Sequence, residues 1–113
     1  MTSALPYAAE APTREAMDAM AGATLLELGT DWCGYCRAAE PFVTKALAGH
    51  PTVKHLKVED GSGRPLGRSY RVKLWPTLIF LDHGKEVARL VRPTDVATVA
   101  QALTQIDFQS SEQ

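Results

Sequence analysis

The stretch Trp32-Cys33-Gly34-Tyr35-Cys36 holds both cysteines of this chain of 113 residues. Two cysteines this close together enclose too small a loop to staple a fold, so they serve redox chemistry or bind a metal. A structural zinc site needs four ligands, and His50, His55 and His83 show no ligand-like pairing. We therefore predict redox chemistry and no metal site. His50 and His83 lie in predicted turns, and we expect them in solvent.

The cysteine pair follows a predicted strand and begins a predicted helix. Residues 24–28 are mostly apolar, as in a buried strand, and residues 37–49 have the composition of a helix that Pro41 should kink. At a helix N-terminus, unpaired amides and the helix dipole favour a thiolate and lower its pKa below the free value of about 8.5. We therefore expect Cys33 to be the nucleophile and Cys36, one turn further on, to be the resolving thiol.

Helices and strands alternate along the rest of the chain. The predicted elements are helix 13–22, strand 24–28, helix 37–49, strand 53–59, helix 66–70, strands 78–81 and 86–91, and helix 94–106. This order predicts an α/β fold with a central mixed sheet of four to five strands and helices on both faces. A right-handed helical crossover joins the first two strands.

The chain has room for one domain, which we place at residues 13–108. Its 12.3 kDa and 45% hydrophobic content are enough for a single core. Residues 1–12 carry two prolines and several alanines without periodicity, which predicts a loosely ordered arm with at best a short strand at 5–7. Residues 109–113 are predicted to form a flexible tail.

Composition narrows the classes of partner. The formal net charge is -1, so no strongly basic face points to nucleic acid or an anionic membrane. No apolar run approaches the roughly 20 residues that span a bilayer. The first residues lack the cationic start and apolar stretch of a signal peptide, so the expected location is cytoplasmic. We expect a monomer that acts on proteins rather than on nucleic acid or membranes.

Further residues make the chain resemble the thioredoxin family. The matching features are Trp32 before the pair, Arg37 after it, Pro41 five residues after Cys36, Trp75-Pro76-Thr77 as a cis-proline loop, and Tyr70 six residues before that proline. The resemblance covers residues 23–106 and implies the thioredoxin fold and thiol-disulfide exchange.

The resemblance also implies a substrate-binding surface. In the family, the residue before the cis-proline offers its backbone to an extended substrate that lies across the nucleophilic cysteine. By position, the substrate-binding residues are then Trp32, Gly34, Tyr35, Trp75, Pro76, Thr77 and Arg92. Trp75 could instead be a core residue, and Tyr70 is expected to serve packing.

Glu27 stands six residues before Cys33, where many thioredoxins carry a buried aspartate that relays a proton to or from the resolving cysteine. A desolvated carboxyl group suits a general acid and base near neutral pH, although Glu27 could also be an exposed strand residue. His55 or Lys57 should take the place of the family's partner lysine. We favour His55, because the apolar positions of its strand then align with those of the family.

The chain departs from the family at two points. Gly34-Tyr35 replaces the usual glycine and proline and matches the pair found in bacterial disulfide isomerases. Tyr35 should free a backbone amide for the thiolate, which predicts a more oxidising couple than that of a typical thioredoxin. Arg92-Pro93 stands where the family usually has a glycine, which predicts an apolar groove with one cationic edge and an altered substrate choice.

The expected activity is reduction of protein disulfides by Cys33 and Cys36 through a mixed disulfide. We expect no bound cofactor. In the family, a thioredoxin reductase recharges the pair, and another thiol reductant could do so here. Two alternatives stay open: a disulfide oxidase or isomerase, and a redox-inert binding module that uses the fold as a docking surface.

Overall fold

The computed structural model describes residues 5–107 and confirms the predicted order of helices and strands. The elements are α1 (Arg14–Asp18), β1 (Ala23–Gly29), α2 (Gly34–Ala48), β2 (Lys54–Glu59), α3 (Pro65–Ser69), β3 (Thr77–Asp82), β4 (Lys85–Val91) and α4 (Val96–Thr104). The predicted tail at 109–113 lies outside the described residues, as do residues 1–4 and 108. The bounds of the domain therefore stay a prediction.

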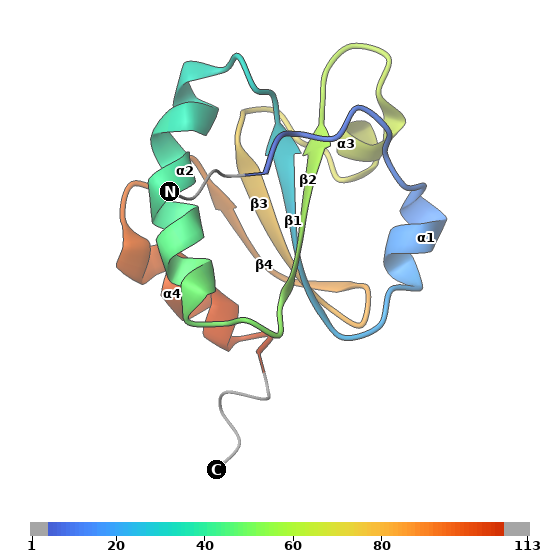
Figure 1. Ribbon diagram of the computed structural model, residues 1–113. Helices are drawn as coiled ribbons and strands as arrows, with labels where there is room; N and C mark the ends of the chain where they lie inside the picture. Colours follow the sequence, from blue (N-terminus) through green and yellow to red (C-terminus); the bar gives the residue numbers. More distant parts are fainter. Residues whose placement is uncertain (1–4, 108–113) are drawn as a thin grey trace.

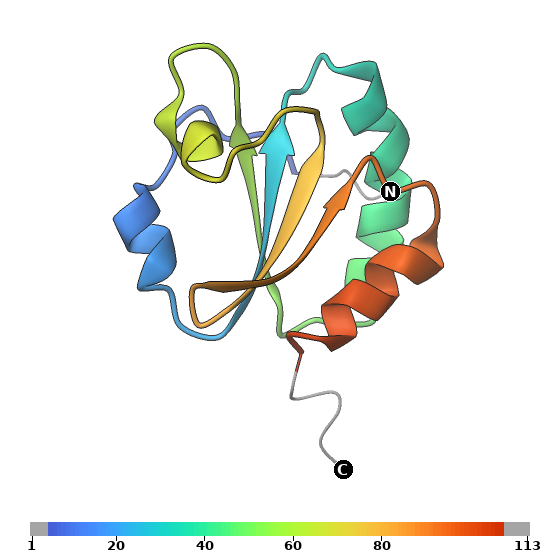
Figure 2. The same cartoon turned by 180° about the vertical axis from the view of Figure 1, so that it is seen from behind.

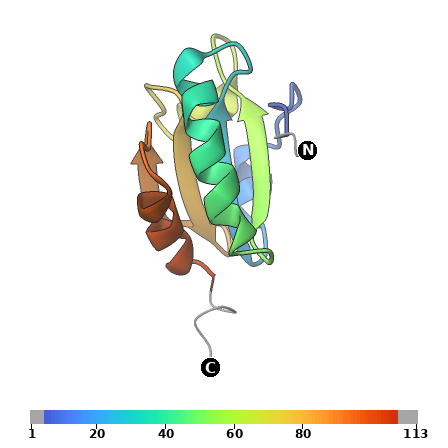
Figure 3. The same cartoon turned by 60° about the vertical axis from the view of Figure 1, so that its left-hand side comes forward.

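The described strands form one mixed sheet in the order β2-β1-β3-β4. β1 runs parallel to β2, which it reaches through α2, and antiparallel to β3, and β3 and β4 form a hairpin. Helices α2 and α4 cover one face, while α1 and α3 cover the other (Figures 1 and 2). Turned to the side, the molecule shows α2 lying along the sheet with α4 beside it (Figure 3).

Alternation along β1 divides its side chains between the two faces of the sheet. Leu25 joins the apolar cluster under α2 and α4, whereas Leu26 and Leu28 join the cluster under α1 and α3. Glu27 shares the parity of Leu25 and therefore points toward α2. This places a carboxyl group inside the protein, directly behind the start of the helix that carries the cysteines.

The segment before α1 differs from the loosely ordered arm that the sequence predicts. Tyr7 is only 7% exposed, and Ala8 pairs in parallel with the outer edge of β2. The Ala8 amide donates to the Lys57 carbonyl at 2.8 Å, and the Glu59 amide donates to the Ala8 carbonyl at 2.9 Å. The pairing satisfies backbone groups that an edge strand would otherwise leave open. Tyr7 and Ala8 are thus packed against the sheet instead of loosely held.

Two local predictions are wrong. Helix α1 ends at Asp18 rather than at Gly22, which has a φ of 77°. His50 is buried and not solvated, since its ring packs against the segment after α4, where its Nδ1 lies 2.5 Å from Asp107 Oδ2. This contact joins the turn after α2 to the segment after α4. His83 is exposed, as predicted.

Within residues 5–107, the helices are too short or too polar to span a bilayer.

Candidate active site

Cys33 and Cys36 lie where β1 gives way to α2, as the sequence predicts. Cys33 is the N-cap of α2, and its Sγ accepts a hydrogen bond from the Cys36 amide at 3.4 Å. Both sulfurs are unbridged and largely buried. The first turn of the helix therefore aims its amides at the Cys33 sulfur, which favours a thiolate there.

The environment of Cys33 favours ionisation. Burial opposes the thiolate, but hydrogen bonds from the Cys36 thiol and from the amides of Cys36 and Tyr35 outweigh it, and Arg92 adds a nearby positive charge. Together these groups lower the pKa of Cys33 below the usual value for a thiol. The Tyr35 amide is the donor that a proline at this position would lack.

Cys36 shows the opposite behaviour. Burial raises the pKa of its thiol to about 11, although a hydrogen bond with the Thr30 backbone works against this rise. Cys36 is therefore protonated at neutral pH and needs a base before it can attack. The two cysteines, one helical turn apart, thus suit different steps: Cys33 can attack as a thiolate, whereas Cys36 must first lose its proton.

An exposed aromatic surface borders Cys33. Trp32 is 70% exposed and packs edge-on against Trp75 with 5.7 Å between ring centroids, and Tyr35 is 58% exposed. The Trp75–Pro76 bond is cis, as the sequence predicts. Gly34 is exposed beside this surface. Trp32, Gly34, Tyr35 and Trp75 thus lie near Cys33, and their role in substrate binding stays a prediction.

Thr77, like Pro76 before it, is buried and in this differs from the exposed members of that set. It begins β3 and is almost fully buried, and its hydroxyl donates to the Leu74 carbonyl at 2.7 Å. Its side chain therefore holds the bend of the cis-proline loop and does not face the surface.

Arg92 covers part of the surface that was expected to meet substrate backbone. Its Nε donates to the Trp75 carbonyl at 2.8 Å, and its guanidinium lies 3.6 Å from the centroid of the Tyr35 ring. The residue adopts a φ of 52°, a conformation that glycine adopts without strain. The Trp75 carbonyl, expected to be open, is thus already bound to a side chain, and a positive charge lies at the edge of the exposed aromatic surface.

Glu27 is 1% exposed and bound on both carboxylate oxygens. Its Oε1 lies 2.7 Å from His55 Nε2, and its Oε2 accepts a hydrogen bond from the Tyr7 hydroxyl at 2.8 Å. His55 is therefore its neighbour on β2, as we favoured. Lys57 instead contacts Glu40 at 3.3 Å and the Leu5 carbonyl at 2.6 Å.

Comparison with known proteins places this site in a family. The family model described as Thioredoxin matches residues 8–105. The chain belongs to the thioredoxin family. Its fold and its cysteine pair are those of a thiol-disulfide oxidoreductase.

Individual thioredoxins match over most of the described chain. The structure of thioredoxin 2 from Pseudomonas aeruginosa in its reduced form shares 51% identity and a TM-score of 0.84, covering 93% of this chain and 97% of that one. The thioredoxin of Chlamydia trachomatis is 41% identical over 62% of this chain and 69% of its own length. The match to a thioredoxin H-type of Fagopyrum esculentum, 30% identical over 59% of this chain, spans only 58% of that relative.

Tyr7 is the site residue that the sequence analysis missed. The sequence signal that could have indicated a close neighbour here is Gly29. A glycine among the large apolar residues of a strand marks a place where another group approaches closely. A Cβ at Gly29 would lie 2.5 Å from Cys36 Sγ and 2.8 Å from the Tyr7 hydroxyl oxygen. This thioredoxin-family protein therefore fills the space beside β1 with a side chain from its N-terminal segment.

No three His, Cys, Asp or Glu side chains gather in the described part of the chain in a way that could hold a metal ion.

We expect Arg92→Gly to raise the pH at which Cys33 becomes reactive. Loss of the guanidinium removes a positive charge that stabilises the thiolate. The rate of alkylation by iodoacetamide as a function of pH measures the shift. Arg71→Gly is the matched control, because Arg71 also has a left-handed φ of 59° but makes none of these contacts. Equal profiles for the two variants would contradict a specific electrostatic effect of Arg92.

Proposed function

We propose that this protein reduces protein disulfides. The Cys33 thiolate attacks one sulfur of a substrate disulfide, forms a mixed disulfide and releases one substrate thiolate. Cys36 then loses its proton and attacks the Cys33 sulfur, which closes the Cys33–Cys36 disulfide and releases the second substrate thiolate. The observation that carries this proposal is the placement of Cys33 at the N-terminus of α2 with Cys36 buried one turn further on, which shifts the pKa values of the two thiols in opposite directions.

The surface around Cys33 suits a protein substrate. Its exposed large side chains are apolar or aromatic, and Arg92 supplies one positive charge at its edge. Aromatic residues and arginine are favoured where proteins dock. We assign Trp32, Gly34, Tyr35, Trp75, Pro76 and Arg92 to substrate binding. Thr77 supports them by holding the loop.

Glu27 is the proposed acid and base for Cys36. It is the carboxyl group that lies behind α2, and it is buried away from competing water. Its position relative to Cys33 is also that of the proton-relaying aspartate of many thioredoxins.

Turnover requires two electrons from outside the chain. We propose that a thioredoxin reductase, or another thiol reductant, returns the Cys33–Cys36 disulfide to the dithiol. Such a cycle belongs in a compartment that keeps thiols reduced, for which we propose the cytoplasm. We further propose that the protein works as a monomer.

A role as disulfide oxidase or isomerase is the second candidate, and the Tyr35 amide favours it. Each unit by which the pKa of Cys33 falls stabilises the reduced form by about 1.4 kcal/mol, or roughly 30 mV for a two-electron couple. We expect a potential more oxidising than that of a thioredoxin with glycine and proline between its cysteines. Equilibration with glutathione or with such a reference thioredoxin measures it. A potential at or below the reference would contradict the expectation.

Two assays decide the direction of the reaction. Acceleration of insulin reduction by dithiothreitol supports the reductase, whereas a docking module would give no acceleration. Oxidative refolding of a reduced, unfolded protein by the disulfide form tests the oxidase. A protein that is active only in the second assay would overturn the proposed direction.

A further inference from the structure

The Tyr7 hydroxyl stands between the two groups that must exchange a proton in the proposed reaction. It donates to Glu27 Oε2 at 2.8 Å and packs with Cys36 in one buried cluster, where the Tyr7 oxygen and the Cys36 sulfur both lie against the open side of Gly29. The missing side chain at Gly29 leaves room for this arrangement. Tyr7 is thus hydrogen-bonded to the carboxyl group and lies beside the sulfur inside the protein.

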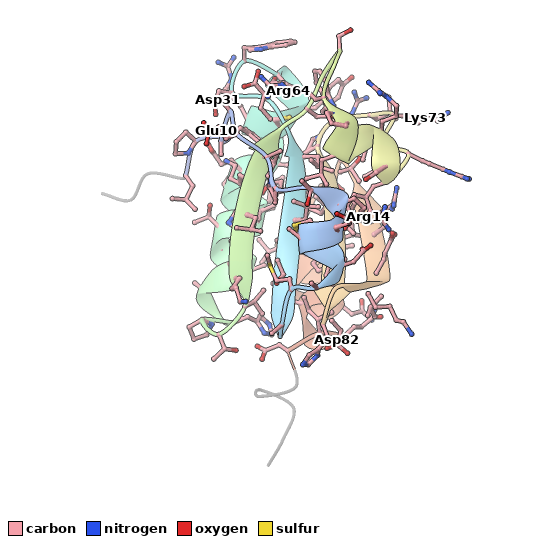
Figure 4. All side chains as sticks on the ribbon, turned by 90° about the vertical axis from the view of Figure 1, so that its right-hand side faces the viewer. Glu10, Arg14, Asp31, Arg64, Lys73 and Asp82 are labelled. Atoms are coloured by element: carbon pink, nitrogen blue, oxygen red, sulfur yellow. The ribbon has the colours of Figure 1, made fainter. Side chains whose placement is uncertain are left out.

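Several contacts fix Tyr7 in this position. Its amide donates to Asp31 Oδ1 at 3.0 Å, and Asp31 lies near the segment before α1 (Figure 4). The next residue, Ala8, pairs with β2, and the Lys57 ammonium lies 4.4 Å from the centroid of the Tyr7 ring. The phenol is thus held from its backbone and from its ring face, which is the preorganisation that proton transfer requires.

We infer that the Tyr7 hydroxyl carries the proton between Cys36 and Glu27. The inference rests on the proposed function, in which Cys36 is the resolving thiol. In the resolving step, the Cys36 S–H proton passes to the Tyr7 oxygen while the Tyr7 O–H proton passes to Glu27. Tyr7 ends as it began, Glu27 becomes protonated, and the Cys36 thiolate attacks the Cys33 sulfur.

Tyr7 suits a shuttle and not a base. Burial, and after it the charge of Glu27, raise the pKa of its phenol far above the usual value. The phenolate form of Tyr7 is therefore unfavourable. Tyr7 gives its proton to Glu27 only as it receives one from Cys36. The other titratable groups that face it are Asp31, Lys57 and Cys36, and Glu40 stands behind Lys57.

Glu27 has a route by which it can pass the proton on. His55 Nε2 lies 2.7 Å from the oxygen that Tyr7 does not use, and the His55 side chain is 18% exposed. A cavity of about 270 Å³ is lined by Glu27, His55, Glu40 and Lys57 among others. The proton that leaves Cys36 can thus reach solvent through His55 while the released substrate thiolate takes one from solvent.

The test is Tyr7→Phe, which removes the hydroxyl and keeps the ring. Reduced protein is mixed with dithiobis(nitrobenzoate), which releases one coloured thiolate when Cys33 attacks and a second when Cys36 resolves the mixed disulfide. We expect the first phase to stay within about twofold of the wild-type rate and the second to slow by about tenfold or more at neutral pH. The deficit should shrink as the pH rises, because hydroxide then removes the Cys36 proton directly.

Tyr70→Phe is the matched control, because the Tyr70 hydroxyl is buried with no hydrogen-bond partner among residues 5–107. This variant should leave both phases unchanged. An unchanged first phase in Tyr7→Phe also reports that the variant is folded. A resolving rate within about twofold of wild type in Tyr7→Phe would overturn the inference.

A double-mutant cycle separates proton transfer from a structural effect. If Tyr7 acts through Glu27, Glu27→Gln and Tyr7→Phe together should slow resolution no more than the slower single variant. Independent, multiplying effects would overturn the inference. If the wild-type protein itself shows no second phase, the proposed function fails instead, so the two failures are distinguishable.

Discussion

Cys33→Ser is expected to abolish the acceleration of insulin reduction, leaving only the rate of dithiothreitol alone. A serine hydroxyl does not ionise at neutral pH and cannot form the mixed disulfide. Cys36 cannot replace it, because it is 3% exposed and burial raises the pKa of its thiol to about 11. The onset and slope of insulin turbidity measure the loss.

Cys36→Ser is the partner variant for this experiment. It keeps the Cys33 thiolate and loses the resolving step, so substrate should remain bound through a stable mixed disulfide. Non-reducing electrophoresis and mass spectrometry detect that adduct, and adducts trapped from cell extract identify the partners. If Cys33→Ser retained wild-type activity, or if adducts formed on Cys36 in that variant, the assignment of the two roles would be wrong.

Gly29→Ala is expected to destabilise the protein by about 1–3 kcal/mol and to slow the resolving step with it. The new Cβ would lie 2.5 Å from Cys36 Sγ and within 3.0 Å of two atoms of Tyr7. Cys36 is held in α2, and Tyr7 is held by the pairing of Ala8 with β2. Neither can move away without breaking a contact that the site uses. Urea unfolding measures the loss of stability, and the two-phase thiol assay measures the change in rate.

Gly49→Ala is the control for this substitution. A Cβ there meets only the Ala46 carbonyl oxygen at 3.7 Å, an ordinary contact, and the φ of −86° is allowed for alanine. We expect a free energy of unfolding within about 1 kcal/mol of wild type and an unchanged resolving rate. A Gly29→Ala protein as stable and as fast as the Gly49→Ala protein would show that the packing around Cys36 is looser than these distances imply.

The predicted order of elements was right because it depends on local patterns. Leu25, Leu26 and Leu28 mark a buried strand by their composition, and the cysteine pair directly after them marks the start of a helix. The choice of His55 as the side-chain partner of Glu27 was also correct. The period of two along β2 puts His55 and Lys57 on the same face, and the register places Lys57 opposite Glu27, so this choice depended on the alignment with the family and not on the strand pattern.

The errors concern contacts between distant parts of the chain. Tyr7 reaches Glu27 across 20 positions, and His50 reaches Asp107 across 57. A proline-containing stretch without periodicity resembles a loose arm, and a histidine in a turn resembles a solvated one. Tyr7 is buried because Ala8 beside it pairs with the edge of β2, and His50 is buried because it contacts Asp107 after α4. Both partners lie far away in the sequence, so the residues next to Tyr7 and His50 do not reveal them.

For this protein, the sequence by itself determined the fold class, the nucleophile and resolving thiol that we propose, and the cis-proline loop beside them. Each depends on residues adjacent in the chain or on a motif of known spacing. Only the tertiary structure decided that Arg92 binds the Trp75 carbonyl and that Tyr7 binds Glu27 and packs beside Cys36. The physical reason is that hydrogen bonds of buried polar groups depend on which distant segments the packed core brings within about 3 Å of one another.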